Sequence, residues 1–372
     1  MMHSYAGSRI RSHIPLLLLL LTVGCVADPE PSGRDDPFEA DRGVVVLNEG
    51  VWRMDNASLT LYDPAGDRTV EDWFGVANPG ERIGDTGNEL VVRGGYLYAI
   101  LSESATIEVI SLPSGRSHGR VLLPPGSSPR SIAFASDSVA WVSCLDDDAV
   151  YRWNPLTLQP GERVPVGPAP EGVAVAAGRL FVANSGLGAL REDEEGSGEV
   201  EVFDARTGAP VGTIDVGGNL QRMWYLPATG RIYVLVGALL PDTTAGGLVE
   251  IDPLTLEVGH RWHVPGIWTG TVDPVAAEAF LVCHRGLYRI ALAESSGLKG
   301  PSPPELLIPG PFSTLTDEVP HSVAVAPTTG EVYLGVARGY YQAPGRVDRY
   351  GRGGALLGSF SVGLNPVAIA FY

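Results

Sequence analysis

Basic residues are scarce in this sequence. It holds 26 Lys and Arg against 43 Asp and Glu, which gives a formal net charge of -17 at pH 7. Lys299 is the only lysine in the chain. A surface of this charge repels the phosphates of nucleic acids and anionic lipid headgroups. We therefore expect no nucleic-acid partner and no direct contact between the folded part of the chain and a membrane surface.

Catalytic and metal-binding motifs are also missing. The sequence contains no GxSxG, HExxH or Gly-rich phosphate loop. None of its seven histidines stands at a repeated position, which argues against a copper or zinc centre built from several His. We predict no catalytic residue, no metal ligand and no cofactor, and we favour a binding protein over an enzyme.

The first 24 residues are typical of a bacterial lipoprotein signal. Arg9 and Arg11 precede an apolar run from Ile14 to Val23, which is too short to span a bilayer comfortably. The run leads into LTVGC, which matches a lipobox except that Thr22 stands where Leu is commoner. Residues 1–24 are therefore predicted to be a signal peptide and Cys25 the lipidation site. The alternative is an ordinary signal peptide followed by a coincidental cysteine.

Residues 25–42 are rich in Pro, Asp and Glu and poor in aliphatic side chains. Such a segment cannot bury enough apolar surface to fold, so it is predicted to be a flexible tether. The domain is expected to span residues 43–372. Val26 stands where an Asp often retains lipoproteins in the inner membrane. We therefore place the protein in the cell envelope, preferably at the outer membrane.

Sustained helical periodicity is absent, and a β-rich repeat takes its place. Units such as VGPAPEGVAVAAGRLFVANSG followed by GEVEVFDARTGAPVGTIDVGG contain four short runs of β-branched and apolar residues separated by Gly, Pro and Asp. Strands that open a unit are expected near Leu90, Ile132, Val173, Met223, Thr271, Val323 and Val367. Seven units at roughly 40 to 50 residues predict an all-β, seven-bladed β-propeller with four antiparallel strands per blade.

The first and last strands of the domain hold different positions within the repeat unit, and this difference predicts how the ring closes. The domain begins with a second strand, VVVL (Val44 to Leu47), and ends with a first strand, PVAIAFY (Pro366 to Tyr372). Pairing these segments completes one blade from both ends of the chain. Cys144 and Cys283 then occupy equivalent second strands three blades apart, too far for a disulfide. They are predicted to be buried free thiols.

The repeat pattern VGxxPxGVAV, LFVANSG, VEVFD and TG resembles the YncE-like seven-bladed β-propellers. The first blade resembles a lipoprotein branch of that family with a domain of unknown function. The residues that carry this likeness are NEG (Asn48 to Gly50), NASLTLYDP (Asn56 to Pro64), Phe74, Asn78 and IGDTGNEL (Ile83 to Leu90). Some relatives are outer-membrane lipoproteins that capture cobalamin for a transporter, and others bind peptides or polysaccharide fragments. The resemblance therefore implies capture of a ligand at the cell envelope without naming the ligand.

Loops that enter each first strand should surround one mouth of the central channel, where a rigid scaffold commonly carries its binding site. Alignment on Glu171 of APEGVAV gives one residue per blade. The seven residues are Asn88, Arg130, Glu171, Gln221, Thr269, His321 and Val367. We predict that the six polar residues among them, all except Val367, bind the ligand; the plainer interpretation is that polar residues at a channel mouth are simply solvated.

Aromatic residues are expected on the same face. Trp52, Trp268, Tyr340 and Tyr341 fall in loops on the mouth side, with Arg53 beside Trp52. Aromatic faces and arginine donors together suit a flat or sugar-like ligand. The alternative for each ring is packing against its own blade.

Three short polar segments need separate interpretation. In the NEG motif, Gly50 is predicted to make a turn and Asn48 to brace the loop, while Glu49 has no assigned role. The acidic runs at 146–148 and 192–195 are the only candidates for a calcium site, and neither has EF-hand spacing. Calcium is kept as a secondary candidate.

Three functions remain open from the sequence. The leading one is an envelope lipoprotein that captures a small molecule, sugar or cofactor at the mouth and hands it to an outer-membrane transporter. The second is a lactonase-like hydrolase in which Arg130, Glu171 and His321 converge. The third is a scaffold that docks a protein partner through its rim.

Overall fold

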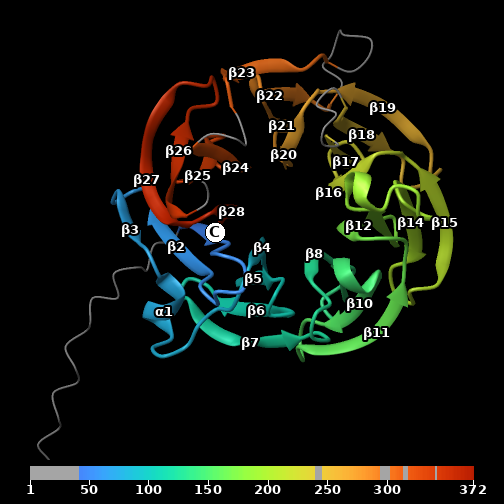
Figure 1. Cartoon of the computed structure of the whole chain (residues 1–372), viewed down its shortest axis with the longest axis horizontal. Helices are drawn as coiled ribbons and strands as arrows, with labels where there is room; N and C mark the ends of the chain where they lie inside the picture. The colour runs from blue at the N-terminus through green and yellow to red at the C-terminus, as the bar shows by residue number, and fades with distance from the viewer. Residues whose placement is uncertain (1–41, 239–244, 294–301, 313–316, 340–341) are drawn as a thin grey trace, which may run out of the picture. The chain divides into compact units, whose positions relative to one another are not determined.

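Seven four-stranded antiparallel sheets form a ring around a central channel (Figure 1). The computed structural model describes residues 42–238, 245–293, 302–312, 317–339 and 342–372. The predicted signal peptide, Cys25 and nearly all of the tether lie outside this part of the chain, as do Tyr340 and Tyr341. The predicted all-β, seven-bladed propeller is confirmed.

Each blade contributes one innermost strand to the wall of the channel. These strands are β28 (Pro366–Phe371), β4 (Gly87–Arg93), β8 (Pro129–Phe134), β12 (Pro170–Ala176), β16 (Asn219–Leu226), β20 (Ile267–Asp273) and β24 (Glu318–Val325). The second strands are β1 (Val44–Asn48), β5 (Tyr96–Leu101), β9 (Ala140–Cys144), β13 (Arg179–Asn184), β17 (Arg231–Gly237), β21 (Glu278–Cys283) and β25 (Val332–Arg338).

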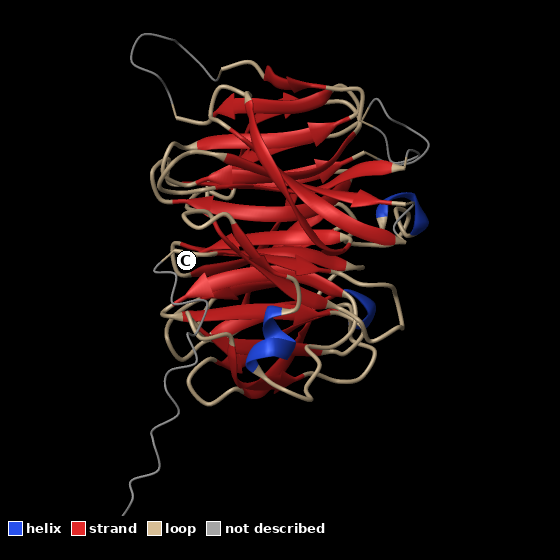
Figure 2. Ribbon diagram, turned by 90° about the vertical axis from the view of Figure 1, so that its left-hand side faces the viewer, coloured by secondary structure: helices blue, strands red, loops and turns tan. Residues whose placement is uncertain are grey.

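The outer half of each blade consists of its third and fourth strands. The third strands are β2 (Ser58–Asp63), β6 (Thr106–Ser111), β10 (Ala149–Asn154), β14 (Glu199–Asp204), β18 (Gly247–Ile251), β22 (Gly286–Ala291) and β26 (Ala343–Tyr350). The outermost strands are β3 (Arg68–Val70), β7 (Arg116–Leu122), β11 (Gln159–Pro165), β15 (Pro210–Asp215), β19 (Val258–His263), β23 (Glu305–Pro309) and β27 (Leu356–Leu364). Figure 2 shows the strands running between two loop-bearing faces.

Burial explains why second strands are nearly continuous apolar runs. Blades pack face to face, so both faces of a second strand are covered, and every residue of β1, β9 and the apolar stretch Leu97 to Leu101 is buried. An outermost strand has one covered face only: β7 alternates between exposed and more buried side chains. The hydrophobic clusters lie between neighbouring blades and include Trp141 and Trp153.

The ring closes as the phase of the repeat predicts. Strand β28 pairs antiparallel with β1, with Val44 opposite Phe371 and Val46 opposite Ile369. The backbone N–H of Gly43 donates to Tyr372 O at 3.1 Å, and the Tyr372 N–H donates to Gly43 O at 3.1 Å. The first blade is therefore made from both ends of the domain, and the whole ring is built from residues 43–372.

In the described part of the chain, helix is limited to short segments. The helix α1 (Trp73–Ala77) follows β3 and buries Trp73 and Phe74 against the first and second blades. Single 3-10 turns occur at Leu145–Asp147 and Gly188–Leu190. Within the described ranges, no helix has the length and hydropathy needed to cross a bilayer.

Cys144 and Cys283 are buried free thiols, as predicted. Both belong to second strands: every residue of β9 is buried, and so is every residue of β21 after Glu278. Burial disfavours the thiolate and raises the pKa of Cys144 to about 12, and it also raises the pKa of Cys283.

Candidate functional site

Every innermost strand carries a register irregularity near its first residues, next to the channel mouth. In β8, Pro129 pairs with Cys144 and Ile132 with Val142, so Arg130 and Ser131 together oppose a single residue. The other six innermost strands shift register at the equivalent point. A bulge bends the strand and re-aims its side chains, which is a recurrent device at functional edges of sheets.

The bulges align two rings of residues around the channel. The upper ring, nearest the mouth, is Asn88, Arg130, Glu171, Gln221, Trp268, His321 and Val367. All seven line one cavity of about 330 Å³. Six of them are the residues predicted from the sequence to share the mouth.

The sixth blade differs from the predicted alignment. Its register places Ile267 opposite Cys283 and Thr269 opposite Val282, so Trp268 is the bulged residue and belongs to the upper ring. Thr269 lies one residue deeper along the same strand. Both residues line the mouth cavity.

A lower ring lies one residue further along each strand, and only Thr269 among its members was predicted from the sequence. It comprises Glu89, Ser131, Gly172, Arg222, Thr269, Ser322 and Ala368. Glu89, Ser131, Arg222 and Thr269 line both the mouth cavity and the channel cavity of about 470 Å³ beneath it, so the two spaces are continuous. The sequence did hold one indication of the lower ring: each of its residues directly follows a residue that was predicted to lie at the mouth.

On one side of the upper ring the polar groups satisfy each other. Arg130 donates from Nε to Glu171 Oε2 at 3.0 Å and from Nη2 to Glu171 Oε1 at 2.9 Å. The Asn88 amide, oriented to satisfy both its atoms, donates to Arg130 O at 2.9 Å and accepts from Arg130 Nη1 at 2.8 Å. Arg130 and Glu171 are thus held by a bidentate pair between neighbouring blades.

Glu89 is part of the same satisfied side. Its carboxylate accepts from the Ile132 N–H at 2.9 Å and from Ser131 Oγ at 3.3 Å. The walls of the channel exclude bulk water around it, which raises the pKa of Glu89, while the charge of Arg222 and the Ile132 N–H act in the opposite direction.

The remaining upper-ring side chains are positioned by local contacts. Trp268 donates from Nε1 to Pro320 O at 2.8 Å, and its ring meets His284 edge-on at a centroid distance of 5.1 Å. His321 Nε2 lies 3.3 Å from Glu49 Oε2. This contact places Glu49 of the NEG motif beside the mouth. From the sequence, Glu49 had no assigned role.

The rest of the NEG motif is architectural, as predicted. Asn48 is buried and donates from Nδ2 to Ser58 Oγ at 3.1 Å and to Thr60 Oγ1 at 3.0 Å. Gly50 has φ of 82°, and a Cβ at this position would lie 2.8 Å from the Ala57 backbone nitrogen. The chain turns here because only glycine fits this conformation and contact without strain.

Trp52 and Arg53 stand apart from the cavity, although the sequence grouped them with it. They belong to the loop between β1 and β2; Trp52 is 59% exposed, and the Arg53 guanidinium lies 4.1 Å from the centre of its ring. Neither residue lines the mouth cavity. The loop is braced by Asp85, which accepts from the N–H groups of Arg53 at 3.2 Å and Asp55 at 2.9 Å.

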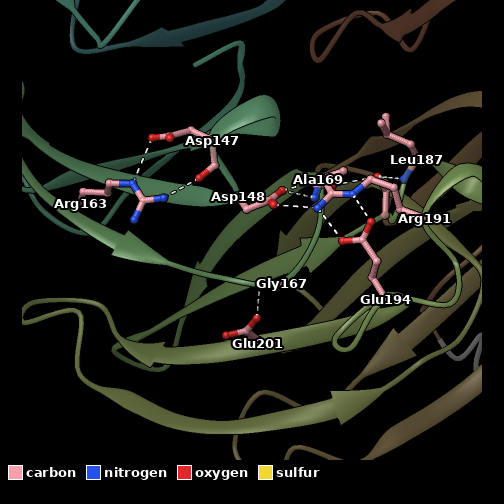
Figure 3. Close-up of polar contacts among 10 residues, drawn as sticks. Asp147, Asp148, Arg163, Gly167, Ala169, Leu187, Arg191, Glu194 and Glu201 are labelled. Atoms are coloured by element: carbon pink, nitrogen blue, oxygen red, sulfur yellow. Dashed lines mark hydrogen bonds and ion pairs between the residues drawn. The ribbon is translucent and has the colours of Figure 1, made fainter. Parts of the chain in front are cut away.

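Arginines partner the acidic runs that suggested calcium (Figure 3). Asp148 accepts from Arg191 Nη1 at 2.8 Å and Nη2 at 2.7 Å, and from the Ala169 N–H at 2.8 Å. Arg191 also donates to Glu194, and Arg163 donates to Asp147. Arg191 holds the pKa of Asp148 below its usual range. Among the residues whose placement is described, no group of three or more His, Cys, Asp or Glu is arranged to hold a metal ion.

No family model and no curated protein matches this chain. Solved structures match it in fold. A quinoprotein alcohol dehydrogenase-like protein from Bacteroides thetaiotaomicron is 15% identical, covering 88% of this chain and 78% of that one, with a TM-score of 0.64. Hydrazine synthase from Kuenenia stuttgartiensis is 14% identical over 76% of this chain and 88% of that one, with a TM-score of 0.59. A Lactobacillus plantarum protein is 12% identical over 89% and 99%, with a TM-score of 0.58. These likenesses establish a β-propeller fold and assign no specific family.

Proposed function

We propose that this protein captures a small molecule or short polymer at the mouth of its channel. One observation carries the proposal: the bulges of all seven innermost strands bring their side chains onto a single cavity of about 330 Å³ that opens into the channel. A concave cavity of this size, in which polar side chains converge, is a common form of small-molecule site. Binding is favoured over lactonase-like hydrolysis because both carboxylate oxygens of Glu171 are already held by Arg130.

The proposal also states how the protein is anchored and which kind of partner receives the ligand. The likeness to YncE-like lipoproteins, together with the LTVGC signal ending at Cys25, supports an envelope protein tethered by lipid, preferably at the outer membrane. A transporter in that membrane would then be the receiving partner. Replacing Cys25 with Ser should move the protein from the membrane fraction to the soluble fraction. Unchanged fractionation of the variant would contradict the anchor.

A thermal-shift screen tests ligand capture. The protein produced from Val26 onward, which keeps the whole closed ring, is heated with cobalamins, haem, oligosaccharides, peptides, lactones, carboxylates, and calcium against EDTA. A ligand at about a hundred times its dissociation constant stabilises the fold by roughly 2.7 kcal/mol, which a melting curve resolves. We expect at least one compound to raise the melting temperature.

Variants then locate the binding site. Gln221→Ala and Trp268→Ala remove side chains that line the cavity and should weaken binding, whereas Trp52→Ala, outside the cavity, should not. If no compound raises the melting temperature, or if Gln221→Ala binds as well as wild type, the result would count against capture at the mouth.

A second function, docking of a protein partner, has a separate observation in its favour. Val51, Trp52 and Met54 are exposed on the loop that Asp85 braces. Exposed aromatic and Met side chains on a rigid loop are typical of protein contact sites. Crosslinking in intact envelopes would capture a partner that the double variant Trp52→Ala/Met54→Ala loses and Gln221→Ala retains. If Gln221→Ala loses the partner and the double variant retains it, the partner binds at the cavity instead.

A further inference from the structure

The mouth is chemically divided into a satisfied side and an open side. Asn88, Arg130, Glu171, Glu89 and Ser131, from the second to fourth blades, use their polar atoms on each other or on nearby backbone. On the fifth and sixth blades the situation is reversed. The side chains of Gln221, Arg222 and Thr269 make no hydrogen bond or ion pair with any part of the chain that the structure describes.

Arg222 is the most informative member of the open side. It lines both the mouth cavity and the channel, so its guanidinium lies where walls of protein displace bulk water. Arg222 interacts with the charge of Glu89 but makes no hydrogen bond to a carboxylate in the described chain, and a partly buried charge whose lost hydration is not replaced by hydrogen bonds is costly. Arg130, two blades away, shows how the same group is satisfied here: a carboxylate accepts two parallel hydrogen bonds from it. The complement that Arg222 lacks is therefore a planar anion, and a carboxylate fits its fork best.

The neighbours of Arg222 add donors for the same group. Gln221 precedes it in the upper ring, and Thr269 belongs to the next blade of the lower ring. All three line the mouth cavity. A carboxylate offers about four acceptor positions, which an arginine fork, an amide and a hydroxyl can fill together.

Beneath the lower ring, the channel changes character. Most of the side chains that line it there are aliphatic or aromatic. Those that are partly exposed include Val91, Phe134, Val175, Val272 and Ile369. An apolar chain or ring placed there would be removed from water at a gain of roughly 25 cal/mol for each Å² buried. The cavity of about 470 Å³ lies within the usual size range of small-molecule sites.

We propose that the captured ligand is a carboxylate-bearing amphiphile, with its carboxylate on Arg222, Gln221 and Thr269 and its apolar body in the channel. This inference rests on the proposed capture function and names the class of ligand. It follows from a guanidinium that makes no hydrogen bond in the described chain and lines both the polar mouth and the channel below it.

Calorimetry with octanoate and decanoate tests the inference on the protein produced from Val26 onward. Octanol, which has the same chain without the charge, and acetate, which has the charge without the chain, are the matched probes. We expect saturable binding of decanoate and octanoate. Octanol should bind at least about tenfold more weakly because it lacks the charge-assisted bidentate contact, and acetate should bind at least about tenfold more weakly because it has no chain to bury in the channel.

Variants separate this contact from a general charge effect. Arg222→Gln should weaken decanoate binding by about tenfold or more, and Arg206→Gln, the same change at an exposed turn outside the cavities, should leave it unaltered. Thr269→Val provides an independent variant if Arg222→Gln does not fold, and it should weaken binding by a few-fold.

The possible failures are distinguishable. Equal decanoate binding by wild type and Arg222→Gln, or by wild type and Thr269→Val where Arg222→Gln does not fold, overturns this inference. Binding of a sugar or cofactor from the panel at the mouth, without binding of decanoate, also overturns it and leaves the capture function standing. Absence of binding by every compound, carboxylates included, overturns both.

Discussion

Arg130 and Glu171 join two neighbouring blades through two parallel hydrogen bonds of 3.0 and 2.9 Å at the mouth of the channel. Their side chains are 27% and 20% exposed, so solvent screens the pair only in part. We expect Glu171→Gln to lower the free energy of unfolding by about 2 kcal/mol, because it leaves the charge of Arg130 without its partner. Denaturant titration measures the change.

The double variant Arg130→Gln/Glu171→Gln should cost less than the two single changes added together, since removing both charges leaves neither stranded. Arg93→Gln provides the matched control. Its pair with Asp137 lies at 2.7 Å, with side chains 41% and 85% exposed, and should cost under about 1 kcal/mol. Strict additivity of the two mouth substitutions would show that the pair does not hold the blades together.

Glu89 should make the protein less stable as the pH rises. Exclusion of water from the channel raises its pKa above the ordinary value of 4.5, so above pH 4.5 the folded state holds a proton that the unfolded state releases. Stability therefore falls as the pH rises from 4.5 to the raised pKa, by about 1.4 kcal/mol for each unit of the shift. Glu89→Gln should remove this slope and be the more stable protein at neutral pH.

The measurement is the free energy of unfolding at several pH values for wild type, Glu89→Gln and Glu162→Gln. Glu162 is exposed on β11, so its replacement should leave the pH slope unchanged. An identical slope in wild type and Glu89→Gln would refute the assignment.

The clamp between Asp148 and Arg191 should fail in acid. Arg191 holds the pKa of Asp148 below 3.8, so the clamp stabilises the fold above that pH and is lost as the pH falls through the lowered pKa. Arg191→Gln should cost about 1 kcal/mol at neutral pH, a modest figure because solvent reaches both side chains. The cost should vanish when the pH is below the pKa of Asp148. Acid titrations of wild type, Arg191→Gln and the control Arg206→Gln would show whether the curves converge.

Cys144 and Cys283 should resist thiol reagents while the ring is folded. Burial raises the pKa of Cys144 to about 12, so almost no thiolate is present near neutral pH, and packing blocks access. Mass spectrometry after iodoacetamide treatment should find both thiols unmodified in buffer and both modified in denaturant. Rapid labelling of either residue in the folded protein would indicate that its blade opens.

Periodicity made the fold predictable. Second strands such as Val44 to Leu47 and Leu97 to Leu101 are apolar on both faces because a blade lies on each side, and this leaves a distinct mark every 40 to 50 residues. The phase at the two ends then fixed the pairing of β1 with β28. These features are local in the sequence, so they could be seen without coordinates.

The site was only half predictable, and the bulges explain why. Regular alternation would turn Arg222 away from the channel if Gln221 pointed into it, but a bulge lets two consecutive residues line the same space. In the sixth blade the alignment took Thr269, one residue past the irregularity at Trp268. Whether an arginine finds a hydrogen-bonding carboxylate also depends on neighbouring blades. Arg130 donates to Glu171, 41 residues away, whereas Arg222 donates to no carboxylate in the described chain.

The pairing of β28 with β1 has a consequence for the order in which the molecule assembles. Val46 and Ile369 are separated by more than 300 residues, and bringing two such points together in an unfolded chain costs about 5 kcal/mol of loop entropy. Much of that cost disappears if the intervening blades stack on one another first, since each new blade carries the free end further around the circle. We therefore expect the seam to form late in folding and to separate early in unfolding. Until it forms, the apolar edge of β1 stays open, so a partly assembled ring is the state most exposed to pairing with another chain.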